Sequence, residues 1–193
     1  MASVALKIVI ATDAWKPQIN GVVTTLSHVE GYLRAQGCEV RVIHPGDFHT
    51  FALPNYKEIC VAWNVWKFAE IFESFKPDCV HIATEGPIGL AARRYLTKRG
   101  LPFTTSLHTK FPEYVNQRIG MPVSWGYAFL RWFHEPSKAT LVTTESMRDE
   151  LTARGLKDLV VWTRGVDTQL FSPERGDKSR EGSSQPVMVY VGR

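Results

Sequence analysis

Four short segments of the 193-residue chain hold most of the residues that could do chemistry. They are residues 12–21, 81–89, 106–114 and 164–173, and they carry carboxylates, histidines, two lysines and glycines. These groups serve general acid–base catalysis and anion binding in proteins. The first three segments each follow a predicted strand, so we expect them to line one crevice at the carboxyl edge of a sheet.

The end of the first segment favours an anion site. Gly21 stands where an irregular loop meets a helical pattern, and a residue without Cβ lets a phosphate approach the backbone closely. The first amides of a helix have no internal partners and carry the positive end of its dipole. The alternative is that Asn20 is an N-cap and Gly21 only eases the turn. The fingerprint G-x-G-x-x-G is absent from this loop, which counts against a nicotinamide or flavin enzyme.

Three further side chains have both a catalytic and a structural interpretation. Asp13 either orients a substrate hydroxyl or hydrogen-bonds loop amides, and Glu85 either acts in the crevice or caps the helix that follows Gly86 and Pro87. His108 follows a strand and is either a site residue or a structural histidine with satisfied hydrogen bonds. The six histidines of the chain lack ligand spacing, which argues against a zinc site.

Alternating strand and helix patterns must position these residues. The apolar run at residues 5–11 predicts a buried strand, and apolar residues three and four apart at residues 22–33 predict a helix. Repeated alternation of this kind predicts an α/β fold with a doubly wound parallel sheet covered on both faces. Further strands are predicted at residues 39–44, 58–63, 79–83, 102–107, 138–143 and 158–162, further helices at 65–75, 86–99 and 145–154, helical pieces within 111–135, and an irregular stretch at 48–56.

Composition and charge narrow the class of protein. The apolar fraction of 44% suits a globular core, and the net charge of +4 suits phosphate ligands or an anionic membrane surface. No nucleic-acid-binding motif is present. Three cysteines without a C-x-x-C pair favour a reduced, cytoplasmic protein. No stretch has the length and hydropathy of a membrane span, and the N-terminus lacks a signal-peptide pattern.

The chain changes character near residue 168. Residues 168–186 are polar and rich in glycine, serine and proline, which is a linker composition. Residues 187–191 form a new apolar run, and a strand without a partner at a chain end cannot bury both of its faces. We therefore expect an N-terminal domain at residues 1–167, a linker at 168–186, and the first strand of a truncated C-terminal domain at 187–193.

Taken together, the four segments resemble the N-terminal domain of retaining glycosyltransferases of family four, which have the GT-B fold. Within that family the sequence is most similar to GDP-mannose-dependent α-mannosyltransferases and sulfoquinovosyl-diacylglycerol synthases. The motifs that carry the resemblance are Asp13-Ala14-Trp15-Lys16-Pro17-Gln18-Ile19-Asn20-Gly21-Val22-Val23, Glu85-Gly86-Pro87, His108-Thr109-x-Phe111, and Gly165-Val166-Asp167 with Phe171 and Pro173.

The resemblance implies two Rossmann-like domains that face a cleft, with most donor contacts in the C-terminal domain and most acceptor contacts in the N-terminal one. It implies transfer of a hexose, with mannose favoured, from a nucleotide-diphosphate sugar to a lipid or glycan acceptor. GDP-mannose is the favoured donor, a UDP-sugar is the other candidate, and neither cofactor nor metal is expected. Retention of the configuration at the anomeric carbon suits a same-face reaction in which the departing phosphate takes the acceptor proton. A double displacement would need a carboxylate nucleophile, and the sequence offers no clear one.

Roles for individual residues follow from the same resemblance. His108 would lie near the transferred sugar, and Asp13 or Glu85 would orient the acceptor hydroxyl, which makes these three the catalytic candidates. The candidates for the donor diphosphate are Gly21, Asn20 and Arg193, and those for the acceptor are Trp15, Lys110 and Tyr114.

A peripheral position on the inner face of the membrane is a further expectation, since lipids are among the implied acceptors. Four cations lie late in a predicted helix, where they suit the helix dipole or an anionic lipid surface: Arg93, Arg94, Lys98 and Arg99. The alternative to an enzyme is a stand-alone, non-catalytic nucleotide- or sugar-binding α/β module. The terminal apolar run favours the enzyme, because a module would end on a cap or a polar tail.

Overall fold

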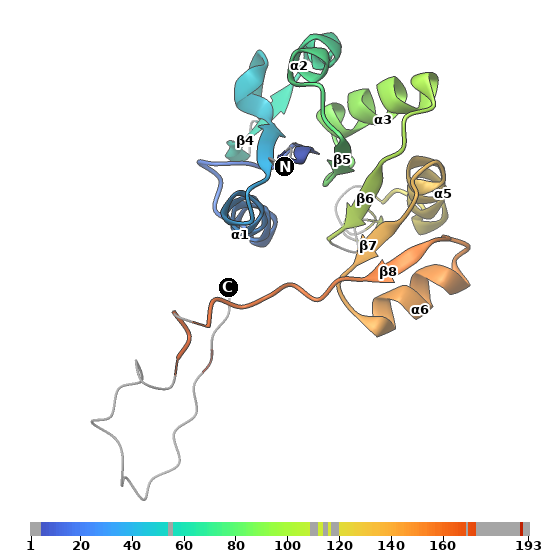
Figure 1. Cartoon of the computed structure of the whole chain (residues 1–193). Coiled ribbons are helices and arrows are strands. Elements are labelled where there is room, and N and C mark those ends of the chain that lie inside the picture. The colour runs from blue at the N-terminus through green and yellow to red at the C-terminus, as the bar shows by residue number, and fades with distance from the viewer. Residues whose placement is uncertain are drawn as a thin grey trace, which may run out of the picture.

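The computed structural model describes residues 5–53, 56–108, 112–113, 116, 120–168, 170–172 and 190. Their centre is a six-stranded sheet in which all neighbouring strands are parallel (Figure 1). The spatial order confirms the predicted doubly wound parallel sheet. In that order the strands are β2 (Glu39–Ile43), β1 (Lys7–Ala11), β5 (Cys79–Ile82), β6 (Thr104–Leu107), β7 (Thr140–Val142) and β8 (Leu159–Val161).

Helices cover both faces of this sheet. The helix α1 (Gly21–Ala35) packs on one face, where Leu26 meets Ile10 and Val40. Figure 1 shows α1 on one side of the strands and α3 and α5 on the other. The helices on that second face are α2 (Phe68–Phe75), α3 (Pro87–Arg99), α5 (Val123–His134) and α6 (Glu145–Ala153).

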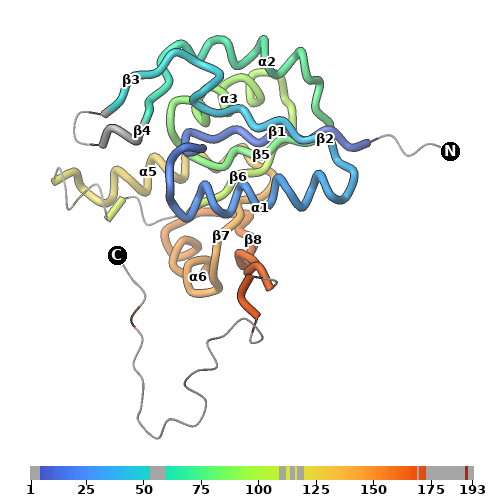
Figure 2. Tube along the Cα trace, turned by 90° about the vertical axis from the view of Figure 1, so that its left-hand side faces the viewer, coloured from blue at the N-terminus to red at the C-terminus, as the bar shows by residue number. Residues whose placement is uncertain are grey.

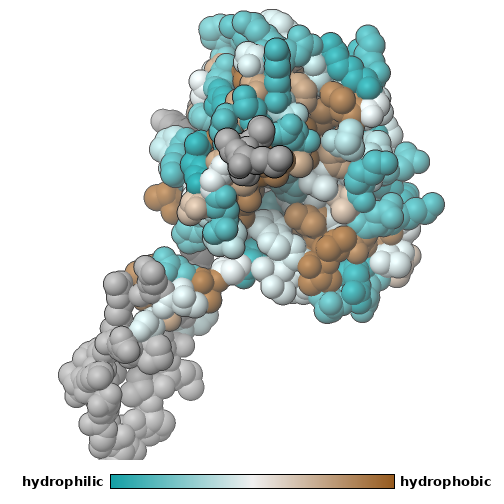
Figure 3. All heavy atoms as spheres, in the orientation of Figure 1, coloured by the Kyte–Doolittle hydropathy of each residue, from teal (hydrophilic) through white to brown (hydrophobic). Residues whose placement is uncertain are grey.

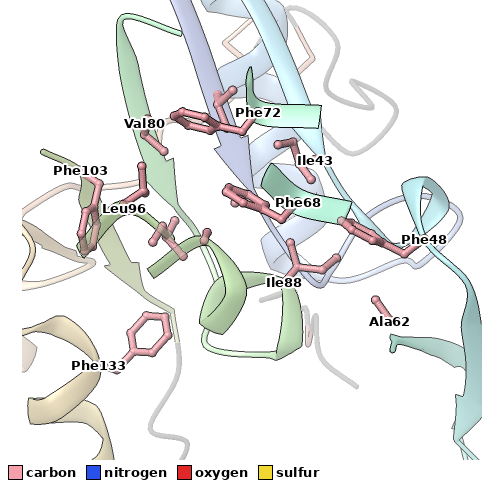
Figure 4. Close-up of a cluster of buried hydrophobic side chains, with 14 residues drawn as sticks. Ile43, Phe48, Ala62, Phe68, Phe72, Val80, Ile88, Leu96, Phe103 and Phe133 are labelled. Atoms are coloured by element: carbon pink, nitrogen blue, oxygen red, sulfur yellow. The ribbon is translucent and has the colours of Figure 1, made fainter. Parts of the chain in front are cut away.

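The largest buried cluster lies between α2, α3 and the first strands (Figure 4). Phe68 and Phe72 stack with ring centroids 5.7 Å apart and pack with Val80 and Ile88. Truncating a buried ring of this kind to alanine typically costs about 3–5 kcal/mol. A second cluster under α5 and α6 includes Leu130. The strands that lead to the candidate site are therefore held on a rigid core.

The structure differs from the sequence-based expectation at residues 48–56. Instead of an irregular stretch, β3 (Thr50–Leu53) pairs antiparallel with β4 (Tyr56–Ala62) in a separate two-stranded sheet. The register shifts between Ala52 and Leu53. The strand β3 has only four residues and is followed directly by Pro54, a residue type that cannot donate a hydrogen bond to a ladder. Its sequence pattern was therefore too short to detect. The predicted helix at residues 65–75 is also divided, into a 3₁₀ turn (Val65–Lys67) and α2.

Several predicted helix ends are confirmed. Gly37, Gly100 and Gly155 follow α1, α3 and α6 with φ of 85°, 64° and 85°, a left-handed conformation that glycine adopts without steric cost. Figure 2 shows the β3–β4 hairpin and α5 at the same end of the sheet as the start of α1. The loops at that end therefore frame the carboxyl edge of the strands.

The predicted terminal strand and most of the predicted linker fall outside the described residues, so the expected domain boundaries stay predictions. None of the helices within the described ranges has both the length and the hydropathy needed to cross a bilayer. On the face shown in Figure 3, apolar patches alternate with hydrophilic residues.

Candidate functional site

The Asp13 carboxylate joins the first loop to the start of α3. It accepts hydrogen bonds from the backbone amides of Ile88 at 2.8 Å and Gly89 at 3.2 Å, and from the Thr84 hydroxyl at 2.8 Å. In return the Thr84 hydroxyl oxygen accepts from the Asp13 amide at 2.7 Å. Burial raises the pKa of Asp13 above its ordinary value, although these hydrogen bonds act in the opposite direction. Asp13 thus has a structural role, although its amide partners belong to α3 and not to its own loop, and its role toward an acceptor hydroxyl stays a prediction.

Two glycines make this junction sterically feasible. A Cβ at Gly86 would lie 2.5 Å from the Asp13 carboxyl carbon, and a Cβ at Gly89 would lie 1.9 Å from the carbonyl oxygen of Thr84. A methyl group at Gly89 would force the start of α3 away from the strand ends, and one at Gly86 would displace the Asp13 carboxylate. The segment Glu85-Gly86-Pro87 is therefore shaped by close packing, whatever ligand it also meets.

The start of α1 has the geometry of a capped helix. The Asn20 side chain accepts hydrogen bonds from the amides of Val22 and Val23, both at 3.0 Å, so the N-cap interpretation of Asn20 is realised. Gly21 is exposed and is not among the residues with positive φ. A Cβ there would lie 3.5 Å from a guanidinium nitrogen of Arg164, an ordinary contact distance. No acidic residue lies in the first turn, so the helix dipole stays available to an anion.

Trp15 is a core residue in this structure. Its side chain packs with Leu26 and Val42 under α1, its ring lies 6.0 Å from that of His44, and only 8% of the residue is exposed. The expectation that Trp15 binds an acceptor is not supported by this placement, because an acceptor could reach little of the ring. The sequence motif gave no means of separating a core tryptophan from a binding one.

His108 and Arg164 meet at the carboxyl edge, although 56 residues separate them. The guanidinium of Arg164 lies 3.0 Å from His108 Nδ1 and 3.3 Å from the His108 carbonyl oxygen. On the other side of the ring, Nε2 lies 2.9 Å from the Ser106 hydroxyl. Burial, followed by the charge of Arg164, lowers the pKa of His108 to about 4. The imidazole is therefore neutral at pH 7.

The Ser106 hydroxyl also contacts a second buried histidine. His81 Nε2 lies 3.0 Å from Ser106 Oγ, and His81 Nδ1 lies 2.9 Å from Thr104 Oγ1. Burial and the neighbouring His108 lower the pKa of His81 to about 4. The sequence pattern alone predicts no role for His81, Ser106 or Arg164. A histidine within the apolar strand at residues 79–83 and an arginine directly before Gly165 were the available signals.

Glu85 contacts a third buried histidine, and its negative charge also acts on His108, whose pKa it raises against the effect of burial. Its carboxylate is 3.4 Å from His134 Nε2, and His134 Nδ1 is 2.9 Å from the Thr105 hydroxyl. His134 is buried at 4% exposure, whereas the Glu85 side chain is 24% exposed. Glu85 does not cap α3, since the N-cap residue is Gly86 and Asp13 supplies the carboxylate. Its catalytic role stays a prediction.

A groove of about 850 Å³ runs along α1 and ends at the cluster. Thr25, His28 and Tyr32 of α1 form one wall, and the segment after β8, which includes Arg164 and Asp167, forms the other. Three of the predicted site residues, Lys110, Tyr114 and Arg193, lie outside the described residues. Within the described ranges, no group of three or more histidine, cysteine or acidic residues is arranged to hold a metal ion.

The basic cluster on α3 is partly occupied by internal contacts. The Arg93 guanidinium lies 3.8 Å over the ring of Trp132 and donates to the Phe133 carbonyl at 2.9 Å. Arg99 pairs with Glu73 at 2.9 Å. The two other members, Arg94 and Lys98, are exposed. The proposed lipid contact therefore reduces to these two side chains.

Comparison with known proteins connects this geometry to a family. The chain is 25% identical over 211 aligned residues to the GDP-mannose-dependent alpha-mannosyltransferase of Mycobacterium tuberculosis, an alignment that covers 97% of this chain and 56% of the relative. It is 22% identical to the enzyme of the same description from Corynebacterium glutamicum, of which 51% is covered. The alpha-monoglucosyldiacylglycerol synthase of Acholeplasma laidlawii is 30% identical over 129 residues, 58% of this chain and 32% of that protein.

The chain spans about half the length of the mannosyltransferases that it matches, and it corresponds to their N-terminal half. The six-stranded parallel sheet agrees with the Rossmann-like N-terminal half of a GT-B fold. The sequence model of the family described as Glycosyltransferase Family 4 matches residues 19–170. This range includes Gly21, the segment after β5, His108 and Arg164. The chain belongs to glycosyltransferase family 4.

Proposed function

We propose that this chain forms the acceptor-side half of a retaining glycosyltransferase that moves mannose from GDP-mannose to a lipid or glycan acceptor. A UDP-sugar is the second candidate donor. Membership of family 4 and the activities of the longer relatives support this proposal. The observation that carries it is the meeting of Gly21, His108 and Arg164, from three separate segments, at the carboxyl edge of the sheet.

The donor diphosphate would lie against the start of α1. A nucleoside diphosphate gains negative charge as the glycosidic bond breaks, and oriented dipoles and cations stabilise that charge. Because Asn20 already accepts from two amides, the contribution of α1 would come from its dipole and from the open approach at Gly21. Arg164 would add positive charge, and Arg193 is expected to add more from the second domain.

The acceptor hydroxyl would approach the sugar from the side of the departing phosphate. In this same-face reaction the acceptor oxygen bonds to the anomeric carbon, the bond to the diphosphate breaks, and a phosphate oxygen takes the hydroxyl proton. A neutral His108 suits this scheme because it leaves the proton transfer to the phosphate. Glu85, which is partly exposed, is the described carboxylate better able to meet an acceptor, since Asp13 is engaged by α3.

Valine at Gly21 tests the diphosphate site in the full-length protein. A larger side chain would intrude on the phosphate, and we expect kcat/KM for GDP-mannose to fall about 100-fold, or about 2.7 kcal/mol. Folding should be unaffected, since Gly21 has no positive φ and a Cβ meets only Arg164. Gly31→Val is the matched control further along α1, away from its start, where a Cβ meets nothing within 4 Å.

Transfer is measured with labelled GDP-mannose and UDP-glucose and a membrane lipid extract, and the anomeric configuration of the product is read by NMR. An inverted product contradicts the retaining assignment. A folded Gly21→Val protein with full turnover contradicts the diphosphate site.

Nucleotide binding without transfer by the full-length protein supports the alternative, a non-catalytic binding module. We expect the 193-residue chain alone to transfer very weakly, and robust transfer by it would refute the division of donor and acceptor sites.

A further inference from the structure

A continuous chain of hydrogen bonds runs from the surface through His108 into the sheet. It joins Arg164, His108, Ser106, His81 and Thr104, and its four links measure 3.0, 2.9, 3.0 and 2.9 Å. The inner members lie on neighbouring strands β5 and β6, where His81 is paired with Thr104. The outer members, His108 and Arg164, lie beyond the ends of β6 and β8.

The chemistry of the end group dictates where the protons lie. A guanidinium can donate hydrogen bonds but cannot accept them, so Nδ1 of His108 must be the acceptor of its contact with Arg164. A neutral imidazole carries one N–H, which is then on Nε2, 2.9 Å from the Ser106 oxygen, and a hydrogen bond to the Ala83 carbonyl also favours a proton on this ring. The low pKa of His108 makes the neutral form the relevant one at pH 7.

Ser106 can accept this proton however its own hydroxyl is oriented. The hydroxyl hydrogen has two acceptors within reach, His81 Nε2 at 3.0 Å and the Ala83 carbonyl at 3.3 Å. In both arrangements a lone pair of Oγ remains for His108. Because Ser106 is 1% exposed, water competes little for these bonds.

We propose that Arg164 is a positioning residue for His108, which fixes the imidazole in its Nε2–H tautomer while the Ser106 hydroxyl, braced by His81, holds the opposite nitrogen. This inference rests on the proposed function, in which His108 stands beside the transferred sugar. In this tautomer Nδ1 can accept a hydrogen bond but cannot donate one. When an anion draws the guanidinium away, the ring presents an acceptor to a substrate hydroxyl.

Nitrogen-15 NMR of the histidine rings in the ligand-free full-length protein tests the tautomer directly. We expect His108 to be Nε2-protonated in the wild type and to exchange between tautomers in Arg164→Met, which removes the donor and keeps an unbranched apolar stem. Arg164→Lys should retain the wild-type tautomer, because an ammonium group also only donates. An Nδ1-protonated His108 in the wild type, or an unchanged tautomer in Arg164→Met, would overturn the proposal.

The opposite nitrogen is tested by hydrogen exchange and kinetics. The Nε2 proton should exchange slowly with water in the wild type and rapidly in Ser106→Ala. His81→Gln, which retains a polar atom near the position of Nε2, should keep slow exchange, and His81→Leu should lose it. Ser106→Ala should lower kcat about tenfold with little change in the donor KM. Equal exchange in His81→Gln and His81→Leu would refute the bracing role.

The outcomes separate the two proposals. A wild-type protein without transferase activity refutes the proposed function, yet the ring spectra of the ligand-free protein still decide whether Arg164 fixes the tautomer. Conversely, an unchanged ring spectrum in Arg164→Met refutes the positioning role, whereas the transferase activity of the wild type decides the proposed function independently.

Discussion

Alanine at Gly89 would show whether packing shapes the segment after β5. The added Cβ would lie 1.9 Å from the carbonyl oxygen of Thr84 and 3.3 Å from Cγ2 of Ile82. Because the first of these atoms belongs to the backbone, a side-chain rotation cannot relieve the overlap. The start of α3 must move, which draws the amides of Ile88 and Gly89 away from Asp13.

The cost follows from these two effects. Overpacking a tight contact costs about 1–3 kcal/mol, and a hydrogen bond to a charged group contributes about 1.5–3 kcal/mol. One overpacked contact and one lost hydrogen bond therefore lower the free energy of unfolding by about 2.5–6 kcal/mol. This is a large share of the roughly 5–15 kcal/mol that stabilises a typical domain.

Urea unfolding followed by far-ultraviolet circular dichroism at 25 °C measures this loss. Gly31→Ala is the control, because a Cβ there meets nothing within 4 Å and alanine favours the helix by up to about 1 kcal/mol. We expect Gly89→Ala to be strongly destabilised and Gly31→Ala to equal or exceed the wild type. A Gly89→Ala variant within about 0.5 kcal/mol of the wild type would refute the packing argument, since the error of such measurements is smaller than the expected cost.

Two further predictions follow from charges in the structure. The folded-state pKa of His81, lowered to about 4, lies below its unfolded value, so stability is full above about pH 6.5 and is lost as the pH falls toward 4. Between pH 7.5 and 5 this histidine should lower the free energy of unfolding by about 2 kcal/mol. In urea unfolding, His81→Gln should therefore lose about 2 kcal/mol less than the wild type over this range. An identical pH dependence of the two proteins would contradict the assignment. The double variant Arg94→Ala with Lys98→Ala should weaken binding to anionic vesicles at low salt by about 2 kcal/mol, as measured by sedimentation. Replacing all four cations of α3 by alanine should weaken binding by no more than this. Vesicle binding that does not depend on the content of anionic lipid would rule out this patch as a membrane-binding site.

Hydrophobic periodicity was sufficient for most of the fold. Each strand of the six-stranded sheet and the helices α1, α2, α3 and α6 lie within a few residues of their predicted positions. The helices bury one apolar stripe and the central strands bury both of their faces. Their apolar spacing is therefore visible within each short segment of the sequence. The strand β3 was missed because it has four residues, exposes Phe51, and gains its stability from pairing with β4.

The candidate site was predictable only in part. Glycine at the start of α1 and histidine after β6 could be singled out because their positions follow from local pattern. The partners of those residues could not, since Asp13 meets Thr84 across 71 residues and His108 meets Arg164 across 56. Burial of Trp15 likewise depends on α1 folding over it. Such contacts are properties of the tertiary arrangement and leave no periodic trace in the sequence.

The junction at Asp13 has a consequence for exchanging parts between relatives. Its carboxylate reaches the Thr84 hydroxyl and the amides of Ile88 and Gly89, and Gly86 leaves it room. The loop after β1 and the start of α3 thus form one mechanical unit assembled from two distant stretches of sequence. A chimera that imports the first loop from another glycosyltransferase should keep its shape only when the segment after β5 is transplanted with it.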